Sequence, residues 1–206
     1  MAASSRVSAL RPFHHGNLRQ ALIDAALAAP DIEGLSLRQV AAGLGVTAAA
    51  VYRHFRSREE LLFEVAGIGF ERLRQRFAEA FDISVAPASA EEARQRLIRL
   101  AQAYLWFADD APALWRLIFG AQAEAFRKAS KLCGGPNSYD FLPAALLGLY
   151  RWGVISANPS ERDALFAWSA IHGAATLRNG RVPAALVSIS ELADEVAERV
   201  IRALNY

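Results

Sequence analysis

The chain has 206 residues, 53% hydrophobic and 21% charged, which is enough apolar material for one or two globular domains. No apolar run approaches the roughly 18 residues of a membrane span, and the N-terminus lacks the apolar stretch of a signal peptide, so we expect a cytoplasmic protein. The single cysteine, Cys133, excludes an intrachain disulfide and a cysteine-based zinc site.

The net charge of +2 is unevenly distributed along the chain. Residues 1–58 contain seven arginines against three carboxylates, a net of +4, and residues 59–206 have a net of −2. A basic N-terminal end on a near-neutral body indicates a polyanionic partner at that end, although chance can give the same excess.

Helical periodicity extends through the chain without an alternating strand pattern. The first helix is expected over 17–29, where Pro30 interrupts it. Ser36 is a suitable N-cap for a second helix, and Thr47 for a short third one. Ser57 and Glu60 have the spacing of a capping box, at the start of a long fourth helix over 58–81.

A linker-like stretch, "SVAPASA", follows at 84–90. Five further helices are expected over 89–108, 110–128, 138–155, 160–178 and 188–204. The predicted fold is therefore all-α with about nine helices. The predicted domains are residues 1–57, a three-helix module, and residues 58–206, a larger bundle that begins with the fourth helix as a connector.

The second and third helices, 36–44 and 47–55, are separated by a tight turn at Gly45 and Val46. Two short helices joined by a glycine turn are typical of a helix-turn-helix, whose second helix enters the DNA major groove. We expect Val51 and Phe55 of this helix to be buried, because they lie one helical turn apart on one face.

The segment "LSLRQVAAGLGVTAAAVYRHFRSREELLFEV" (35–65) resembles the DNA-binding domain of the tetracycline-repressor (TetR) family of bacterial regulators, and "FHHGNLRQALIDAA" (13–26) resembles the family's first helix. Between them, "ALAAPDIEGLSL" is shorter than the family pattern. Further on, "FAWSAIHGAATLRNGR" (166–181) resembles the Trp-x-x-x-His-Gly segment of one subfamily. The resemblance implies a DNA operator as partner, a homodimer and a small-molecule effector.

The resemblance also implies which residues contact DNA, and their chemistry suits that role. Hydroxyls at helix starts, aromatic and imidazole donors, and arginines can bind phosphate, and Arg38 can also reach a guanine. The expected DNA-contacting residues are Ser36, Arg38, Thr47, Ala48, Ala49, Ala50, Tyr52, His54 and Arg58.

Each assignment has an alternative. Tyr52 can be a core aromatic, His54 a solvated side chain and Arg38 an ordinary surface charge. Arg6 and Arg11 fit a DNA-contacting arm and a simple tail equally well. The three alanines cannot form hydrogen bonds through their side chains, so they offer only close approach or contact with thymine methyl groups, with a preference tolerant of A·T pairs.

The C-terminal half is rich in aromatic residues, and such a bundle can enclose an apolar ligand pocket. The candidate pocket residues are Phe70, Tyr104, Trp115, Phe119 and Trp152, for each of which a plain core position is the alternative. The last two helices carry apolar stripes that predict a dimer interface, with an intrachain bundle as the alternative. The candidate interface residues are Trp168, Ile171, His172, Ala175, Leu192, Val196 and Val200.

The sequence thus predicts a ligand-responsive transcriptional regulator, most often a repressor in this family, without a cofactor. A metal site at His14 and His15 is disfavoured, because no carboxylate or thiolate lies at helical spacing from them. A helical-bundle enzyme with an aromatic pocket, or an interaction protein that does not use DNA, stays open as an alternative.

Overall fold

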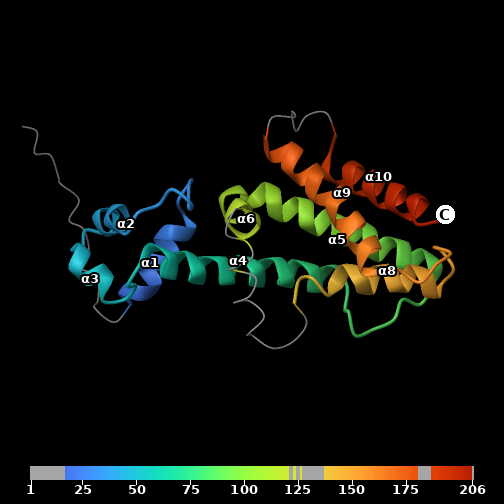
Figure 1. The fold of residues 1–206 in the computed structure, drawn as a ribbon, viewed down its shortest axis with the longest axis horizontal. Coiled ribbons are helices and arrows are strands. Elements are labelled where there is room, and N and C mark those ends of the chain that lie inside the picture. The colour runs from blue at the N-terminus through green and yellow to red at the C-terminus, as the bar shows by residue number, and fades with distance from the viewer. Residues whose placement is uncertain (1–16, 121–122, 124–125, 127–136, 181–186, 206) are drawn as a thin grey trace, which may run out of the picture. The chain divides into compact units, whose positions relative to one another are not determined.

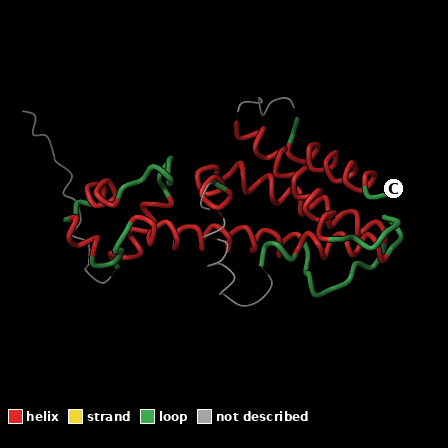
Figure 2. Tube along the Cα trace, viewed as in Figure 1, coloured by secondary structure: helices red, strands yellow, loops and turns green. Residues whose placement is uncertain are grey.

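The computed structural model describes residues 17–120, 123, 126, 137–180 and 187–205. These residues form helices and connecting loops without a strand, which confirms the all-α prediction (Figures 1 and 2). The nine helices within the described ranges are α1 (Leu18–Leu27), α2 (Leu37–Gly43), α3 (Ala48–Tyr52), α4 (Arg58–Ala80), α5 (Ala90–Asp110), α6 (Pro112–Phe119), α8 (Phe141–Arg151), α9 (Glu161–Gly180) and α10 (Ile189–Ala203).

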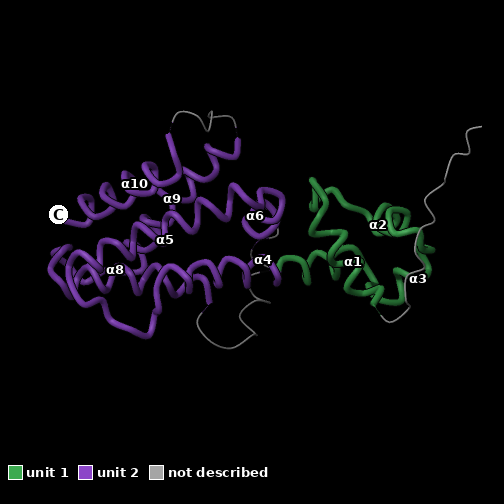
Figure 3. Tube along the Cα trace, turned by 180° about the vertical axis from the view of Figure 1, so that it is seen from behind, with its two compact units in different colours: residues 1–66 green, residues 67–206 purple. Residues whose placement is uncertain are grey.

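The chain divides into two compact units, residues 1–66 and 67–206 (Figure 3). Helix α4 contributes its first residues to the first unit and the remainder to the second. The functional division proposed from the sequence, 1–57 and 58–206, stays a prediction.

The connection between α2 and α3 follows from its capping residues. Ser36 and Gln39 form a capping box: Gln39 N–H donates to Ser36 Oγ (3.2 Å), and Ser36 N–H donates to Gln39 Oε1 (2.9 Å). Helix α2 ends in a Schellman motif, in which Val46 N–H donates to the Ala41 carbonyl (3.0 Å) and Gly45 has a φ of 66°. Because other residues are strained at this φ, Gly45 fixes where the turn occurs.

Helix α3 is held on its unit by Val51 and Phe55, both 0% exposed, as the sequence predicts. The Arg19 guanidinium of α1 lies 5.0 Å from the centroid of the Phe55 ring and pairs with Glu64 of α4 (2.7 Å). Ile32, in the loop after α1, is also buried, although no helical periodicity predicts it. These contacts connect α1, α3 and the start of α4.

Several helices are shorter than the sequence predicts. Helix α1 ends at Leu27 rather than at residue 29, and α3 ends at Tyr52 rather than at residue 55. Helix α6 covers only part of the predicted 110–128, because the backbone at Gly120 is extended. The expected helix is therefore interrupted at Gly120, and Ala123 and Phe126, the described residues beyond it, are again helical.

The predicted capping box at α4 is formed only in half. Glu60 N–H donates to Ser57 Oγ (3.2 Å), as expected. The Glu60 carboxylate, however, accepts from the N–H of Arg56 (2.7 Å) rather than from that of Ser57. The carboxylate thus reaches one residue further back than in the standard motif.

Helix α5 is the central helix of the second unit and contacts α6, α8, α9 and α10. Ser89 caps its start, where Ser89 Oγ accepts from Glu92 N–H (3.0 Å). Buried positions recur along its whole length, from Ala93 to Ala108. Helices α6, α8, α9 and α10 therefore pack around α5.

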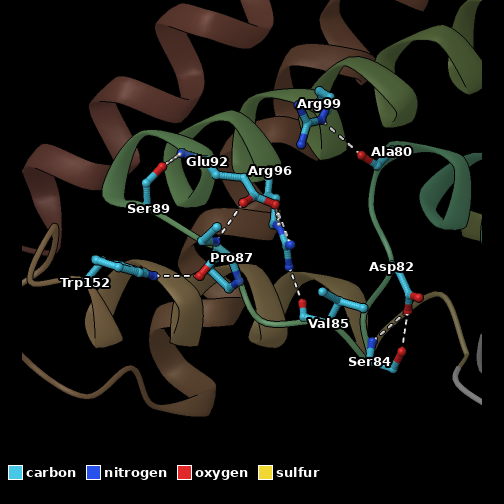
Figure 4. Close-up of polar contacts among 11 residues, drawn as sticks. Ala80, Asp82, Ser84, Val85, Pro87, Ser89, Glu92, Arg96, Arg99 and Trp152 are labelled. Carbon is cyan, nitrogen blue, oxygen red and sulfur yellow. Dashed lines mark hydrogen bonds and ion pairs between the residues drawn. The ribbon is translucent and has the colours of Figure 1, made fainter.

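The loop between α4 and α5 is fixed by Arg96, which is buried although it is charged (Figure 4). Its guanidinium pairs with Glu92 (2.6 Å) and donates to the carbonyl of Val85. The Ala88 N–H and the Arg96 guanidinium lower the pKa of Glu92, so this carboxylate stays charged. The linker-like "SVAPASA" stretch is therefore held against α5 by hydrogen bonds.

An aromatic cluster surrounds His172 of α9. The Tyr104 hydroxyl of α5 lies 2.7 Å from His172 Nδ1, and the Trp115 ring stacks on the imidazole with centroids 5.0 Å apart. Phe119 and Trp168 approach the imidazole edge-on, at 5.4 and 5.8 Å. Burial lowers the pKa of His172 and raises the pKa of Tyr104, so both side chains are uncharged near neutral pH.

Helices α4 and α6 approach closely at Gly69. A Cβ atom added there would lie 2.8 Å from Cγ2 of Ile118 and 3.0 Å from Cδ1 of Leu114. Two residues earlier on α4, a Cβ added at Gly67 would meet nothing within 4 Å. The two glycines therefore lie on the same helix, but only Gly69 is closely packed against another helix.

We expect Gly69→Ala to destabilise the protein by about 1–3 kcal/mol, because the new methyl group overpacks the α4–α6 contact. Gly67→Ala is the matched control and should stabilise it by about 0.5–1 kcal/mol, the usual gain for alanine in a helix. Urea denaturation measures both. Equal stability of the two variants would contradict the close packing at Gly69.

The half-buried imidazole of His172 predicts a pH dependence of stability. Because partial burial lowers the folded pKa of His172 below the unfolded value, the unfolded chain binds more protons, and stability falls as the pH drops through the ordinary histidine range, about 6.5, toward the lower folded pKa. His172→Gln should reduce this loss, and the control His54→Gln, in the first unit, should not. The tryptophans all lie in the second unit, so their fluorescence reports its unfolding in urea.

Candidate functional site

The helix-turn-helix presents part of the predicted DNA-contacting set to solvent. Arg38 and Ala49 are exposed, and Tyr52 is 48% exposed, so Tyr52 is not a core aromatic. Ala48 and Ala50 are half-buried and offer less contact surface than Ala49. The outer side of α3 thus carries small side chains at its start and an aromatic side chain at its end.

Ser36 and Thr47 cap α2 and α3 as predicted. Ser36 Oγ accepts from Gln39 N–H, and Thr47 Oγ1 accepts from Ala50 N–H, each at 3.2 Å. Because these bonds use an oxygen lone pair, each hydroxyl keeps its hydrogen as a donor. The caps and a phosphate contact are therefore compatible.

The Arg58 guanidinium already forms contacts within the protein. Its Nε donates to the carbonyl of Leu35 (2.8 Å), and its Nη1 lies 3.7 Å from Glu59. His54 is half-buried. Arg53 and Arg56, which are not among the predicted DNA-contacting residues, are exposed on either side of the buried Phe55, in the segment "YRHFRSR". The clustering of arginines in that segment is the sequence feature that indicates a phosphate-binding surface.

The second unit contains a cavity of about 510 Å³. Its described walls come from α4, α5, α6, α8, α9, α10 and residues 137–140. The aromatic lining residues are Phe77, Tyr104, Phe119, Tyr139 and Trp168. A volume of this size suits a small-molecule ligand.

The predicted pocket residues divide into three groups. Tyr104 and Phe119 line the cavity. Phe70 and Trp115 are buried beside Phe119, with ring centroids 6.3 and 5.7 Å away, but are not lining residues. Trp152 is wrong as a pocket residue: it is 46% exposed, and its Nε1–H donates to the carbonyl of Pro87 (2.9 Å), which fixes the loop before α5 (Figure 4).

The predicted dimer residues stay a prediction, and most of them have contacts within the protomer. Trp168, Ile171, Val196 and Val200 line the cavity within one protomer. Ala175 is 1% exposed and His172 belongs to the aromatic cluster, while Leu192 is half-buried. These side chains pack inside the protomer because α10 contacts both α5 and α9. The exposed positions of α10 carry mostly polar and charged side chains: Ser190, Glu191, Asp194, Glu195, Arg199 and Arg202.

Helix α9 has a second apolar side that the protomer leaves exposed. We call it the α9 stripe: Phe166, Ala170, Gly173 and Leu177, spaced four, three and four residues apart on one helical face. Phe166 is 47% exposed and Leu177 is 62% exposed. Apolar residues thus occur on opposite sides of one helix, as in a helix covered from both sides.

Within the described ranges, no group of three or more His, Cys, Asp and Glu side chains is arranged to hold a metal ion. His14, His15, Arg6, Arg11 and Cys133 lie outside those ranges. No described helix is long and apolar enough to cross a membrane.

Comparison with known proteins identifies both parts of the chain. A family model described as bacterial regulatory proteins, tetR family, matches residues 22–65. A second, described as tetracyclin repressor-like, C-terminal domain, matches residues 97–204. The HTH-type transcriptional regulator Rv1816 of Mycobacterium tuberculosis is 33% identical over 93 residues, 45% of this chain. The match spans only 38% of the length of this curated relative.

Solved structures share the fold over nearly the whole chain. A protein of unknown function from Rhodococcus sp. RHA1 has a TM-score of 0.72 and 30% identity, over 95% of this chain and 100% of that one. AibR in complex with isovaleryl coenzyme A and operator DNA has a TM-score of 0.59 and 19% identity, over 91% and 97% of the chains. At that identity AibR supports the fold alone.

The family model for the C-terminal domain covers more than half of the chain, and that for the N-terminal domain covers most of the helix-turn-helix unit. The chain therefore belongs to the TetR family of bacterial regulatory proteins.

Proposed function

We propose that this protein is a ligand-responsive DNA-binding transcriptional regulator that acts in the cytoplasm, where its operator is. The observation that carries the proposal is the capped α2–Gly45–α3 connection, with Arg38 and Tyr52 exposed on its surface. Family membership favours this function over the helical-bundle enzyme or interaction protein that the sequence left open. The regulator, most often a repressor in this family, carries out no chemical step.

In this proposal α3 enters the major groove and its two ends have different roles. Tyr52 and the arginines that follow it contact phosphates, which supplies affinity without sequence information. Arg38, exposed at the start of α2, reads a guanine through its bidentate guanidinium. Ala49 offers only a methyl group, so the bases beneath it are selected weakly, through thymine methyl contacts and DNA shape.

A homodimer is proposed through the α9 stripe. Its two ends, Phe166 and Leu177, are exposed, and the small Ala170 and Gly173 between them permit close approach of a second helix. A two-fold axis that pairs this stripe with its own copy is the simplest closed arrangement. A dimer of this kind reads a pseudo-palindromic operator when its two recognition helices, one from each copy, lie about 34–36 Å apart.

The effector is proposed to bind the cavity of the second unit. A ligand shifts the DNA-binding equilibrium only as far as it distinguishes the two conformations, so it must contact elements that differ between them. AibR binds isovaleryl coenzyme A. The described lining of this cavity offers no basic side chain for the phosphates of such a ligand, so the effector class is argued from this chain's own residues below.

Arg38→Ala is expected to weaken binding to DNA from the chain's own upstream region by about 5- to 100-fold, the range for one bidentate base contact. A double variant, Tyr52→Phe with His54→Ala, should weaken it through phosphate contacts. Arg72→Ala removes an exposed arginine from the second unit and is the matched control, with a change below about twofold. A mobility-shift assay at several salt concentrations measures all three.

The salt dependence separates DNA binding from the alternatives, since a DNA-binding protein loses affinity steeply as salt rises. A binding constant that does not respond to salt would contradict the DNA-binding proposal. Unchanged binding by the Tyr52 and His54 double variant would remove their proposed phosphate roles.

Leu177→Glu with Phe166→Glu should convert the dimer to a monomer, because two carboxylates on each copy would meet within the α9 stripe. Val85→Glu is the control: it places a charge at another exposed apolar position, 54% exposed, away from α9. Sedimentation velocity measures the change. A dimer that persists in the double variant, at the concentration where the wild type is dimeric, would exclude this interface.

A further inference from the structure

The cavity of the second unit combines apolar walls with an acidic edge. Among its described lining residues, the side chains that carry a formal charge at neutral pH are Asp140 and Glu161, both carboxylates. Both residues are exposed, whereas the aromatic Tyr104 and Phe77 of the same lining are buried. The charge therefore lies where the cavity meets solvent, and the apolar surface lies inside.

The carboxylate of Glu161 is not required by the fold. Asp163 already caps the start of α9, where its carboxylate accepts from the N–H and the hydroxyl of Ser160, both at 2.7 Å. Glu161 itself forms no hydrogen bond or ion pair with a described residue. Its negative charge is thus available to a ligand.

Asp140 provides the second negative charge from the start of α8. Its Oδ2 accepts from the N–H of Asn137 (2.7 Å), which orients the carboxylate but leaves its charge uncompensated by a described cation. A helix N-terminus by itself favours anions. Here the carboxylates at the starts of α8 and α9 reverse that preference for anything entering the cavity.

The interior supplies rings rather than charges. Tyr104 and His172 stay uncharged near neutral pH, because burial disfavours the charged form of each. Phe77, Tyr104 and Trp168 line the cavity, and the face of an aromatic ring attracts a cation that comes within about 6 Å of the ring centroid. Rings and carboxylates therefore favour the same sign of ligand charge.

We infer that the ligand of this cavity is an organic cation with a largely aromatic body. Its rings contact Phe77, Tyr104 and Trp168, and its positive charge lies toward Asp140 and Glu161. The volume of about 510 Å³ accommodates a molecule of several rings. The inference rests on the proposed function in one respect, that this cavity is the effector site.

A matched pair of probes tests the sign of the charge. Tetraphenylphosphonium and tetraphenylborate have nearly the same size and shape but opposite charge. We expect the phosphonium to bind the purified protein at least about tenfold more tightly than the borate. Isothermal titration calorimetry gives both affinities, and quenching of tryptophan fluorescence gives an independent value because Trp168 lines the cavity.

A charge-neutral variant tests the residues. Asp140→Asn with Glu161→Gln keeps the side-chain shapes, and the asparagine oxygen can still accept from the N–H of Asn137. Its affinity for the phosphonium should fall about tenfold, while its affinity for the borate should rise. The control, Glu79→Gln with Asp194→Asn, removes two exposed carboxylates that do not line the cavity, and should change either affinity less than about twofold.

Three results would overturn the inference: tighter or equal binding of the borate, binding of neither probe, or a phosphonium affinity unchanged in the charge-neutral variant. Operator binding is measured separately, by mobility shift with and without the phosphonium. If the phosphonium binds as expected but leaves the DNA complex intact, the ligand class stands and the effector role of the cavity fails.

Discussion

The second unit depends on the burial of α5, which four other helices contact. A helix covered on so many sides must satisfy its polar side chains internally, since a buried polar group without a partner is costly. Arg96 does so with Glu92 and the Val85 carbonyl, and Tyr104 does so with His172. The first set of bonds fixes the loop after α4, and the second fixes α9. The hydrogen bonds of Arg96 and Tyr104 therefore help to position the cavity walls without a bound ligand.

Features set by local chemistry were predictable from the sequence. Ser36 and Thr47 cap helices because their hydroxyl oxygens accept from N–H groups one turn ahead. Gly45 ends α2 because it has the positive φ that a Schellman motif requires. Burial of Val51 and Phe55 followed from their spacing on a short helix. The α2–α3 connection was predictable because each of these signals lies within six residues of its partner.

The sequence does not predict which part of the structure, or which second copy, covers an apolar face of a helix. Periodicity shows that α9 has apolar sides, but Trp168 contributes to the cavity while Phe166, two residues earlier, is exposed to solvent. The same difficulty applies to Trp152, an aromatic residue whose role is a hydrogen bond to a loop carbonyl. Tertiary contacts decide between a cavity wall, an interface and an anchor, and a single sequence carries no direct record of those contacts.

Helix α6 is one of the elements that join the aromatic cluster to α4 within the second unit, beside the direct contact of Phe77 with Tyr104. Phe119 of α6 lines the cavity and meets the imidazole of His172, and Leu114 and Ile118 of the same helix contact the backbone at Gly69. Because Gly69 has no Cβ atom, α4 and α6 pack closely at this point. Such a closely packed contact leaves the two helices little room to move independently, since packed interiors transmit displacement. A ligand that displaces Phe119 must therefore move α4 together with α6 or break the contact at Gly69.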